Sequence, residues 1–246
     1  MPAARAGSRS VVLRAVAAPS RRILLAAAGL FVASMALFTL IAEDVLDGGG
    51  LVSHDEAVLT WFVDHRTEWM INVARVVSAV GGLVSLLCVG VALGLWLRWR
   101  RWHLAIAIAP TVSLLLAALA SVVAKAAFGR VRPPISLHET HVTSPAFPSG
   151  HATDAGGFFL AAAFVLVITV ADRRPAQLVV IGIAILFAGL VGLSRLVLAV
   201  HWLSDVVAGW ALGTAVAIAA VVVLCYAASR GRNPNQHPPA SRRANT

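Results

Sequence analysis

Charged residues and cysteines are both scarce in this chain. Only 13% of its 246 residues are Asp, Glu, Lys or Arg, whereas a soluble globular domain usually has about a quarter. The two cysteines, Cys88 and Cys225, lie far apart within apolar runs, so a disulfide scaffold is excluded and we expect both to be small buried hydrophobic residues. Apolar residues make up 59% of the chain, and its mean hydropathy is +0.84. These values exclude a soluble globular protein and indicate a membrane protein.

Six apolar segments are long enough to cross a bilayer, which takes roughly 20 helical residues. They lie at 23–42, 76–97, 104–124, 152–171, 177–193 and 206–225. The first is too long for a signal peptide, and Glu43 and Asp44 follow it without a small-residue cleavage site, so we expect it to be retained. The sequence therefore predicts an all-α, polytopic membrane protein built as a bundle of six transmembrane helices.

The arginines indicate how this bundle is oriented. A net charge of +9 would suggest nucleic-acid binding in a soluble protein, but here the positions of the basic residues correlate with those of the spans. They cluster before the first span, between the second and third, between the fourth and fifth, and after the sixth. Because short loops rich in Arg stay in the cytoplasm, both termini are predicted to be cytoplasmic, and we expect no nucleic-acid partner.

The chain divides into a membrane domain and two tails. Residues 23–226 form the predicted membrane domain, and residues 1–22 form a basic cytoplasmic arm. Residues 227–246 lack apolar periodicity and are predicted to be a disordered cytoplasmic tail. Two interpretations of the basic tails stay open: they attract anionic lipid headgroups, or they serve only to set the topology.

The first external loop contains a helix-start pattern. Ser53-His54-Asp55-Glu56 fits a capping box, in which the first and last side chains satisfy free backbone amides. Val58, Trp61 and Phe62 follow at helical spacing. We therefore expect a short helix lying in the membrane interface.

Residues with distinctive chemistry occur at the external ends of the last four spans. Lys125 is the only lysine against nineteen arginines, which indicates a need for a compact ammonium group, although a lone lysine snorkelling at a helix end is the alternative. Arg132 follows two helical turns later, but Pro133 disfavours helix there. Ser149-Gly150 precedes His151 at the start of the fourth span, where free amides and the helix dipole favour an anion.

His201 and Asp205 form a second distinctive pair at the start of the sixth span. They are one helical turn apart, so the carboxylate can accept a hydrogen bond from one ring nitrogen and leave the other free. This is the arrangement of a base and its orienting group in nucleophilic catalysis.

Three complete motifs together resemble a known family. They are Lys125, six residues and Arg132-Pro133; Pro148-Ser149-Gly150-His151; and Ser194-Arg195, five residues, His201, three residues and Asp205. In this order, and across residues 125–213, they resemble the signature of the type 2 phosphatidic acid phosphatase family, which is related to the vanadium haloperoxidases. Few unrelated chains would carry all three.

The resemblance implies a role for each motif residue. It assigns phosphate binding to Lys125, Arg132, Ser149, Gly150 and Arg195. It implies that His201 attacks phosphorus, that Asp205 holds the tautomer of His201, and that His151 protonates the leaving group. It also implies no metal and no cofactor, because cationic side chains neutralise the phosphoryl charge.

Several nearby residues have two open interpretations. Asp154 either tunes or orients His151, or it only complements the helix dipole. Arg130 is either a second phosphate contact or a solvated loop charge. The spacing of His138-Glu139-Thr140-His141 does not match that of zinc hydrolases, so we expect no metal there. Arg66 and Arg75 are expected to anchor at the interface.

The expected function is removal of the terminal phosphate from a lipid phosphate or diphosphate at the extracytoplasmic face of a bacterial plasma membrane. Phosphatidic acid, phosphatidylglycerol phosphate and undecaprenyl diphosphate are all compatible, and the partners are the lipid substrate and the bilayer. Two alternatives stay open, a phosphotransferase with the same site and a non-catalytic lipid-phosphate binder or transporter that has no need of His201 and Asp205. The oligomeric state is also open, because Gly81-Gly82 permits helix contacts inside the bundle or between subunits.

Overall fold

The computed structural model describes residues 21–169 and 173–230, and these residues form helices joined by loops. The long helices are α2 (Arg21–Asp47), α5 (Leu83–Trp99), α6 (Leu104–Phe128), α7 (Gly150–Thr169), α8 (Arg174–Val197) and α9 (Leu203–Arg230). Two shorter helices, α3 (Asp55–His65) and α4 (Glu68–Val80), connect α2 to α5. The arms predicted at 1–22 and 227–246 lie largely outside the described residues, although 227–230 are helical rather than disordered.

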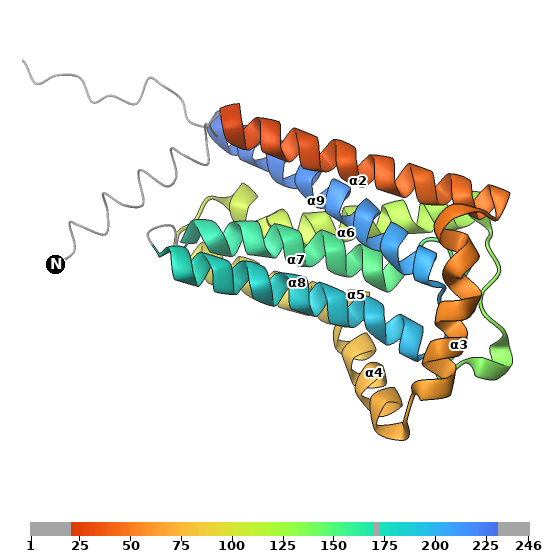
Figure 1. Cartoon of the computed structure of the whole chain (residues 1–246). Coiled ribbons are helices and arrows are strands. Elements are labelled where there is room, and N and C mark those ends of the chain that lie inside the picture. Colours follow the sequence, from red (N-terminus) through yellow and green to blue (C-terminus); the bar gives the residue numbers. More distant parts are fainter. Residues whose placement is uncertain (1–20, 170–172, 231–246) are drawn as a thin grey trace, which may run out of the picture.

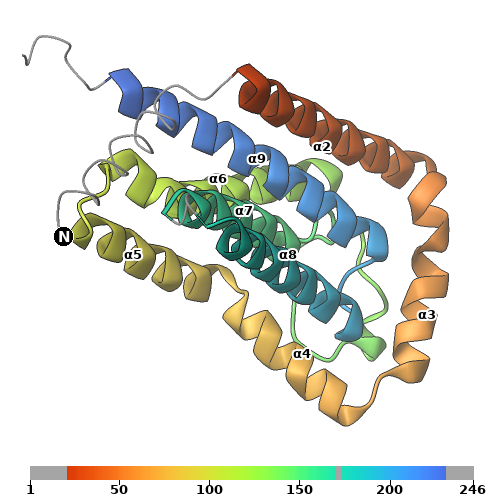
Figure 2. The ribbon, with the colours of Figure 1, turned by 60° about the vertical axis from the view of Figure 1, so that its left-hand side comes forward.

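Helix α7 lies at the centre of the bundle and packs against α6, α8 and α9, while α2 runs along the outside of α9 (Figures 1 and 2). Small residues allow the closest of these contacts. A Cβ atom placed on Gly213 of α9 would lie 2.2 Å from the backbone oxygen of Thr153 on α7. Glycine at this position therefore sets the short distance between the two helices that begin at the candidate site.

The all-α membrane fold is confirmed, with one correction to the spans. Five helices are long and apolar enough to cross a membrane, and the pair α4 and α5 makes a sixth span if the two are counted together. The single helix predicted at 76–97 is wrong, because the chain bends by 51° between α4 and α5. Gly81 and Gly82 lie at this break, where their low helix propensity favours termination.

The small size of Gly81 allows α4 and α8 to approach closely. A Cβ atom on Gly81 would lie 2.3 Å from a methyl group of Val191 on α8. The contact that glycine permits here is therefore inside the bundle, between α4 and α8.

The helix predicted in the first external loop is present as α3, but its capping box is wrong. His54, not Ser53, precedes the helix, and no side chain caps its first turn. The Ser53 hydroxyl donates to the Gly50 carbonyl instead. The Asp55 side chain reaches across to α9.

The predicted burial of the cysteines is wrong for Cys88 and only partly correct for Cys225. Cys88 is exposed on α5 and Cys225 is half-buried on α9, and both thiols are free. In a membrane helix an apolar run needs no cover from other helices, because lipid covers it equally well.

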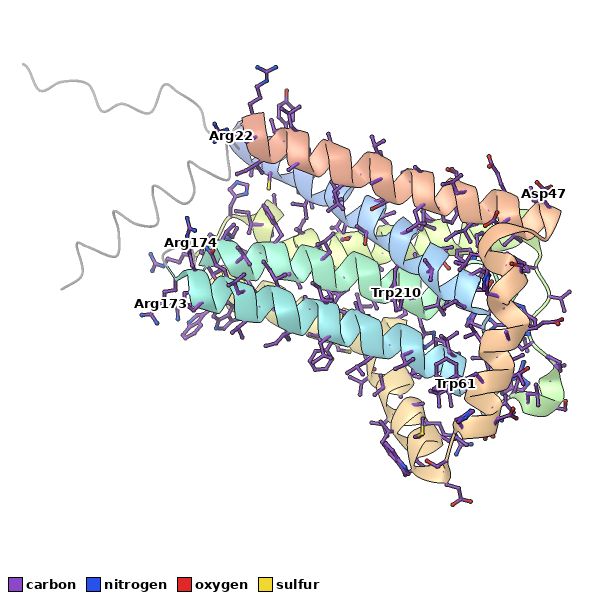
Figure 3. All side chains as sticks on the ribbon, viewed as in Figure 1. Arg22, Asp47, Trp61, Arg173, Arg174 and Trp210 are labelled. Atoms are coloured by element: carbon purple, nitrogen blue, oxygen red, sulfur yellow. The ribbon has the colours of Figure 1, made fainter. Side chains whose placement is uncertain are left out.

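The two ends of the bundle carry different charges. Arg22, Arg173 and Arg174 lie together at one end, and Asp47 and Trp61 lie at the opposite end (Figure 3). Helices α6 and α8 finish at the Asp47 end, and α7 and α9 begin there (Figure 1). This end therefore brings the three sequence motifs together.

Candidate active site

The three motifs come from four helix ends that meet at the Asp47 end of the bundle. Lys125 lies in the last turn of α6, and Arg195 lies in the last turn of α8. Gly150 and His151 begin α7, and His201 lies in the short turn before α9. The Ser149 amide donates to the Asp205 carbonyl at 2.9 Å, which ties the second motif to the third.

His201 and Asp205 form the predicted pair in the interior of the protein. The side-chain atoms His201 Nδ1 and Asp205 Oδ2 are 3.2 Å apart, and the Trp202 amide donates to the same oxygen at 3.0 Å. His201 is 3% exposed and Asp205 is fully buried. On the other side of the ring, Arg132 Nη1 lies 3.1 Å from His201 Nε2.

These neighbours define one tautomer of His201. The carboxylate accepts from Nδ1–H, and the guanidinium can only donate, so Nε2 is unprotonated and its electron pair accepts from Arg132. Burial, followed by the nearby charge of Arg132, lowers the pKa of His201 well below its usual value. The ring is therefore neutral at neutral pH, with Nε2 as its unprotonated nitrogen.

Backbone carbonyls of the loop between α6 and α7 orient two of the three predicted cations. Lys125 Nζ donates to the Pro145 carbonyl at 2.5 Å. Arg132 Nε donates to the Ser144 carbonyl at 2.6 Å, and Arg132 Nη1 also donates to the Val200 carbonyl.

This loop is held in place by Phe147. The Phe147 side chain is fully buried, and its ring lies 4.9 Å from that of Phe128 on α6 and 5.8 Å from that of Phe38 on α2. Burying a phenylalanine ring stabilises the folded state by roughly 2–3 kcal/mol. The carbonyls that orient Lys125 and Arg132 are thus fixed by packing.

Three buried polar atoms among the described residues have no hydrogen-bond partner: Ser149 Oγ, Arg195 Nε and Asp154 Oδ1. The first two belong to groups predicted to bind phosphate, and both carry a hydrogen that an anionic oxygen could accept. Leaving a buried donor unpaired costs about 1–3 kcal/mol. The site therefore offers directed hydrogen-bond donors to an anion.

Ser78, which no sequence motif indicates, contacts two of the predicted residues. Its hydroxyl accepts a hydrogen bond from Arg195 Nη1, and its backbone carbonyl accepts one from the His151 ring. Ser78 lies on α4 just before the break at Gly81. Helix α4, which packs against α8, therefore contributes Ser78 to the site.

Arg130 fits neither of its two predicted roles. Its side chain is only 13% exposed, so it is not a solvated charge. Its guanidinium is engaged by two carboxylates, with Nη1 2.6 Å from Asp205 Oδ1 and Nη2 2.7 Å from Asp55 Oδ2. Asp55 was predicted only as part of a capping box, and its place beside the site was missed.

Arg66 and Arg75 hold the loop between α6 and α7 and do not act as simple interface anchors. Arg66 donates to the carbonyls of Leu137 and Val197 at 3.0 and 3.1 Å, and it pairs with Glu139 at 3.2 Å. Arg75 donates to both the backbone and the side chain of Glu139 at 3.0 Å. Arg66, directly after α3, and Arg75 on α4 therefore hold the loop that carries Arg132.

A buried histidine–aspartate pair that faces cations at the ends of apolar helices defines a class of protein. It is an integral membrane protein whose site suits nucleophilic attack on a phosphate-like anion. Comparison with known proteins identifies the family within that class.

Residues 106–229 match the sequence model of the PAP2 superfamily. The chain is 31% identical over 184 residues to phosphatidylglycerophosphatase B of Bacillus subtilis (strain 168), covering 73% of this chain and 88% of the relative. It is also similar to the crystal structure of a transmembrane PAP2-type phosphatidylglycerolphosphate phosphatase from Bacillus subtilis. The TM-score is 0.66 at 27% identity, covering 83% of this chain and 94% of the other.

The chain therefore belongs to the PAP2 superfamily, and it is a membrane phosphatase of the PAP2 type. This confirms the family resemblance of the three motifs. It also agrees with the expectation of a membrane lipid as substrate.

Proposed function

We propose that this protein hydrolyses the phosphate monoester of phosphatidylglycerol phosphate at the extracytoplasmic face of a bacterial plasma membrane, through a phosphohistidine on His201 and without a metal ion. The observation that carries the proposal is the His201 ring, held by Asp205 on one nitrogen and facing Arg132 with the other. The enzymatic domain is residues 23–226, with its motifs at 125–213.

Substrate binding uses the directed donors of the site. Lys125, Arg132 and Arg195 neutralise the phosphate, and the Ser149 hydroxyl and Gly150 amide complete its hydrogen bonds. Fixed positive groups that face the reacting phosphate stabilise the charge of the transition state most. Three such groups take the place that a metal ion has in other phosphoryl-transfer enzymes.

The first chemical step transfers the phosphoryl group to the protein. His201 Nε2 attacks phosphorus, forming a P–N bond as the P–O bond to the lipid alcohol breaks. His151 gives its proton to the leaving oxygen, and its hydrogen bond to the Ser78 carbonyl holds the ring in place. Asp205 accepts the hydrogen bond from Nδ1–H and stabilises the positive charge that develops on the ring.

The second step restores the enzyme. Water attacks the phosphohistidine, the P–N bond breaks, and the proton of the water passes to His151. Inorganic phosphate leaves, and His201 returns to its neutral form.

The choice of substrate rests on the relatives. Both Bacillus subtilis proteins are named for phosphatidylglycerophosphate. The orientation rests on the arginines, since Arg22, Arg173 and Arg174 lie at the end away from the site, and arginine-rich ends remain in the cytoplasm (Figure 3). Both termini are therefore proposed to be cytoplasmic, with the site outside.

We propose a balancing role for Asp154. Its side chain is 7% exposed, and the charge that acts on it most is the Lys125 ammonium. Because its carboxylate favours the charged form of the Lys125 ammonium, Asp154→Asn is expected to weaken phosphate binding.

The experiment is phosphate release by purified protein in detergent with EDTA. Wild type is expected to release phosphate from phosphatidylglycerol phosphate faster than from phosphatidic acid or undecaprenyl diphosphate. His201→Ala is expected to be inactive, while His65→Ala, on the exposed face of α3, is expected to match wild type. Lipid binding without release would support a binder, release that requires an added alcohol would support a phosphotransferase, and either result would contradict the proposal.

A further inference from the structure

Asp55 is a buried acidic residue on α3, a helix whose other acidic residues are exposed. It begins α3 and is 3% exposed, whereas its neighbour Glu56 and Asp64 on the same helix are both exposed. Burying a carboxylate is costly unless its oxygens are paired and hydrogen-bonded. The partners of Asp55 therefore indicate what it does.

All the partners of Asp55 lie next to the proposed nucleophile. Oδ1 accepts a hydrogen bond from the Ser204 amide at 2.9 Å. Oδ2 accepts from the Ser204 hydroxyl at 2.5 Å and from Arg130 Nη2 at 2.7 Å. Ser204 immediately precedes Asp205, and Asp55 is 149 residues from Ser204 in sequence. Asp55 thus contacts the start of α9 from outside the bundle.

Arg130 connects Asp55 to the aspartate of the pair. Its Nη1 donates to Asp205 Oδ1 at 2.6 Å and to the Ser204 hydroxyl at 2.7 Å. Its guanidinium carbon lies 5.8 Å from the centre of the Trp202 ring, which limits its movement further. Asp205 is held through both oxygens, by Arg130 on Oδ1 and by His201 and Trp202 on Oδ2.

The charges along this chain of contacts alternate. Asp55 is negative, Arg130 positive and Asp205 negative, and His201 becomes positive when its Nε2 is phosphorylated. If Arg130 had only Asp205 as a partner, its charge would offset the carboxylate that His201 needs. By sharing Arg130, Asp55 leaves Asp205 with more of its negative charge for His201.

We infer that Asp55 is a positioning residue for the phosphatase reaction, acting through Arg130 on Asp205 so that Oδ2 stays directed at His201 Nδ1–H while the phosphohistidine forms. This inference rests on the proposed function. Asp55 and Arg130 touch neither the three phosphate-binding cations nor Nε2 in the contacts described above. Their effect is therefore on turnover rather than on binding.

The test compares Asp55→Asn with Asp64→Asn, which removes the same charge from the exposed face of the same helix. Asp55→Asn is expected to lower kcat about 10- to 100-fold, as loss of a residue that orients a functional ligand typically does, with KM changed less than about twofold. Competitive inhibition by inorganic vanadate is expected to be unchanged, because its cationic ligands are intact. Asp64→Asn is expected to match wild type.

A double variant shows whether Asp55 acts through Arg130. If it does, Asp55→Asn combined with Arg130→Gln will be no slower than Arg130→Gln alone, whereas independent effects would multiply. Ser204→Ala keeps all three charges and removes one shared hydroxyl, so it serves if Asp55→Asn fails to fold. Its kcat is expected to fall several-fold, again at constant KM.

The inference would be overturned by normal kcat in Asp55→Asn, or by an effect of Asp55→Asn confined to KM and vanadate inhibition. It would also be overturned if the losses multiply in the double variant, or if Ser204→Ala has normal kcat. Failure of the proposed function is seen separately, in wild type itself. If wild type releases no phosphate, the function and the inference fail together. If wild type is active and Asp55→Asn equals it, only the inference fails.

Discussion

The distance between α7 and α9 is expected to control activity, and Gly213→Ala tests it. The new Cβ would lie 2.2 Å from the Thr153 carbonyl oxygen and 2.8 Å from the Gly157 nitrogen. A carbon and a carbonyl oxygen normally come no closer than about 3.3 Å, so the helices must separate by about 1 Å. Both contacts are with backbone, so a side-chain rotation cannot relieve them.

This separation would move one half of the site away from the other. Helix α7 carries Gly150 and His151, α9 begins just after His201, and the two are joined by the hydrogen bond from the Ser149 amide to the Asp205 carbonyl. A displacement of about 1 Å can cost about 100-fold in rate, and overpacking costs roughly 1–3 kcal/mol of stability.

The assay is phosphate release at saturating lipid, with thermal unfolding measured in parallel. Gly189→Ala on α8 is the matched control, because its Cβ would meet no atom within 4 Å. A Gly213→Ala protein as active and as stable as Gly189→Ala would refute the argument that this contact sets the geometry of the site.

Three further predictions concern other contacts. Ser78→Ala removes the hydroxyl that accepts a hydrogen bond from Arg195. Since a hydrogen bond to a charged group contributes about 1.5–3 kcal/mol, kcat/KM should fall at least about 10-fold. Unchanged initial rates would contradict this prediction. Arg66→Gln removes the ion pair and the two hydrogen bonds to carbonyls made by a side chain that is only 10% exposed. The free energy of unfolding should therefore fall by about 2 kcal/mol. An unchanged melting temperature would show that these contacts do not stabilise the loop. Folding lowers the pKa of His201, so below about pH 6.5 the unfolded chain takes up a proton that the folded chain excludes. Wild type should therefore lose stability relative to His201→Gln as the pH falls below this value. If the melting temperatures of the two proteins change in parallel from pH 7 to 5, the His201 ring is not buried in its neutral form.

The sequence could predict the site residues whose partners are close in the chain or fixed by topology. His201 and Asp205 are one helical turn apart, so their pairing follows from helix geometry alone. Lys125, Arg132 and Arg195 could be placed together because successive spans alternate in direction, which brings their external ends to one side.

Contacts between elements distant in the chain could not be predicted in this way. The segment at Ser53 to Glu56 fits a local capping box, and only the packing of α3 against α9 turns Asp55 toward Ser204 instead. Similarly, Gly81 fits the interior of an apolar run, and the sequence does not show that its small size accommodates Val191 on another helix. In both cases the deciding partner lies more than a hundred residues away.

A phosphohistidine on His201 can be detected by rapid-quench trapping with lipid that carries a radiolabelled terminal phosphate. Wild type mixed with this lipid in EDTA and quenched in alkali should carry label on a peptide containing His201. Acid should release that label, and His201→Ala should carry none. Turnover by wild type with label on no residue at any quench time, or on a residue other than His201, would rule out this phosphohistidine.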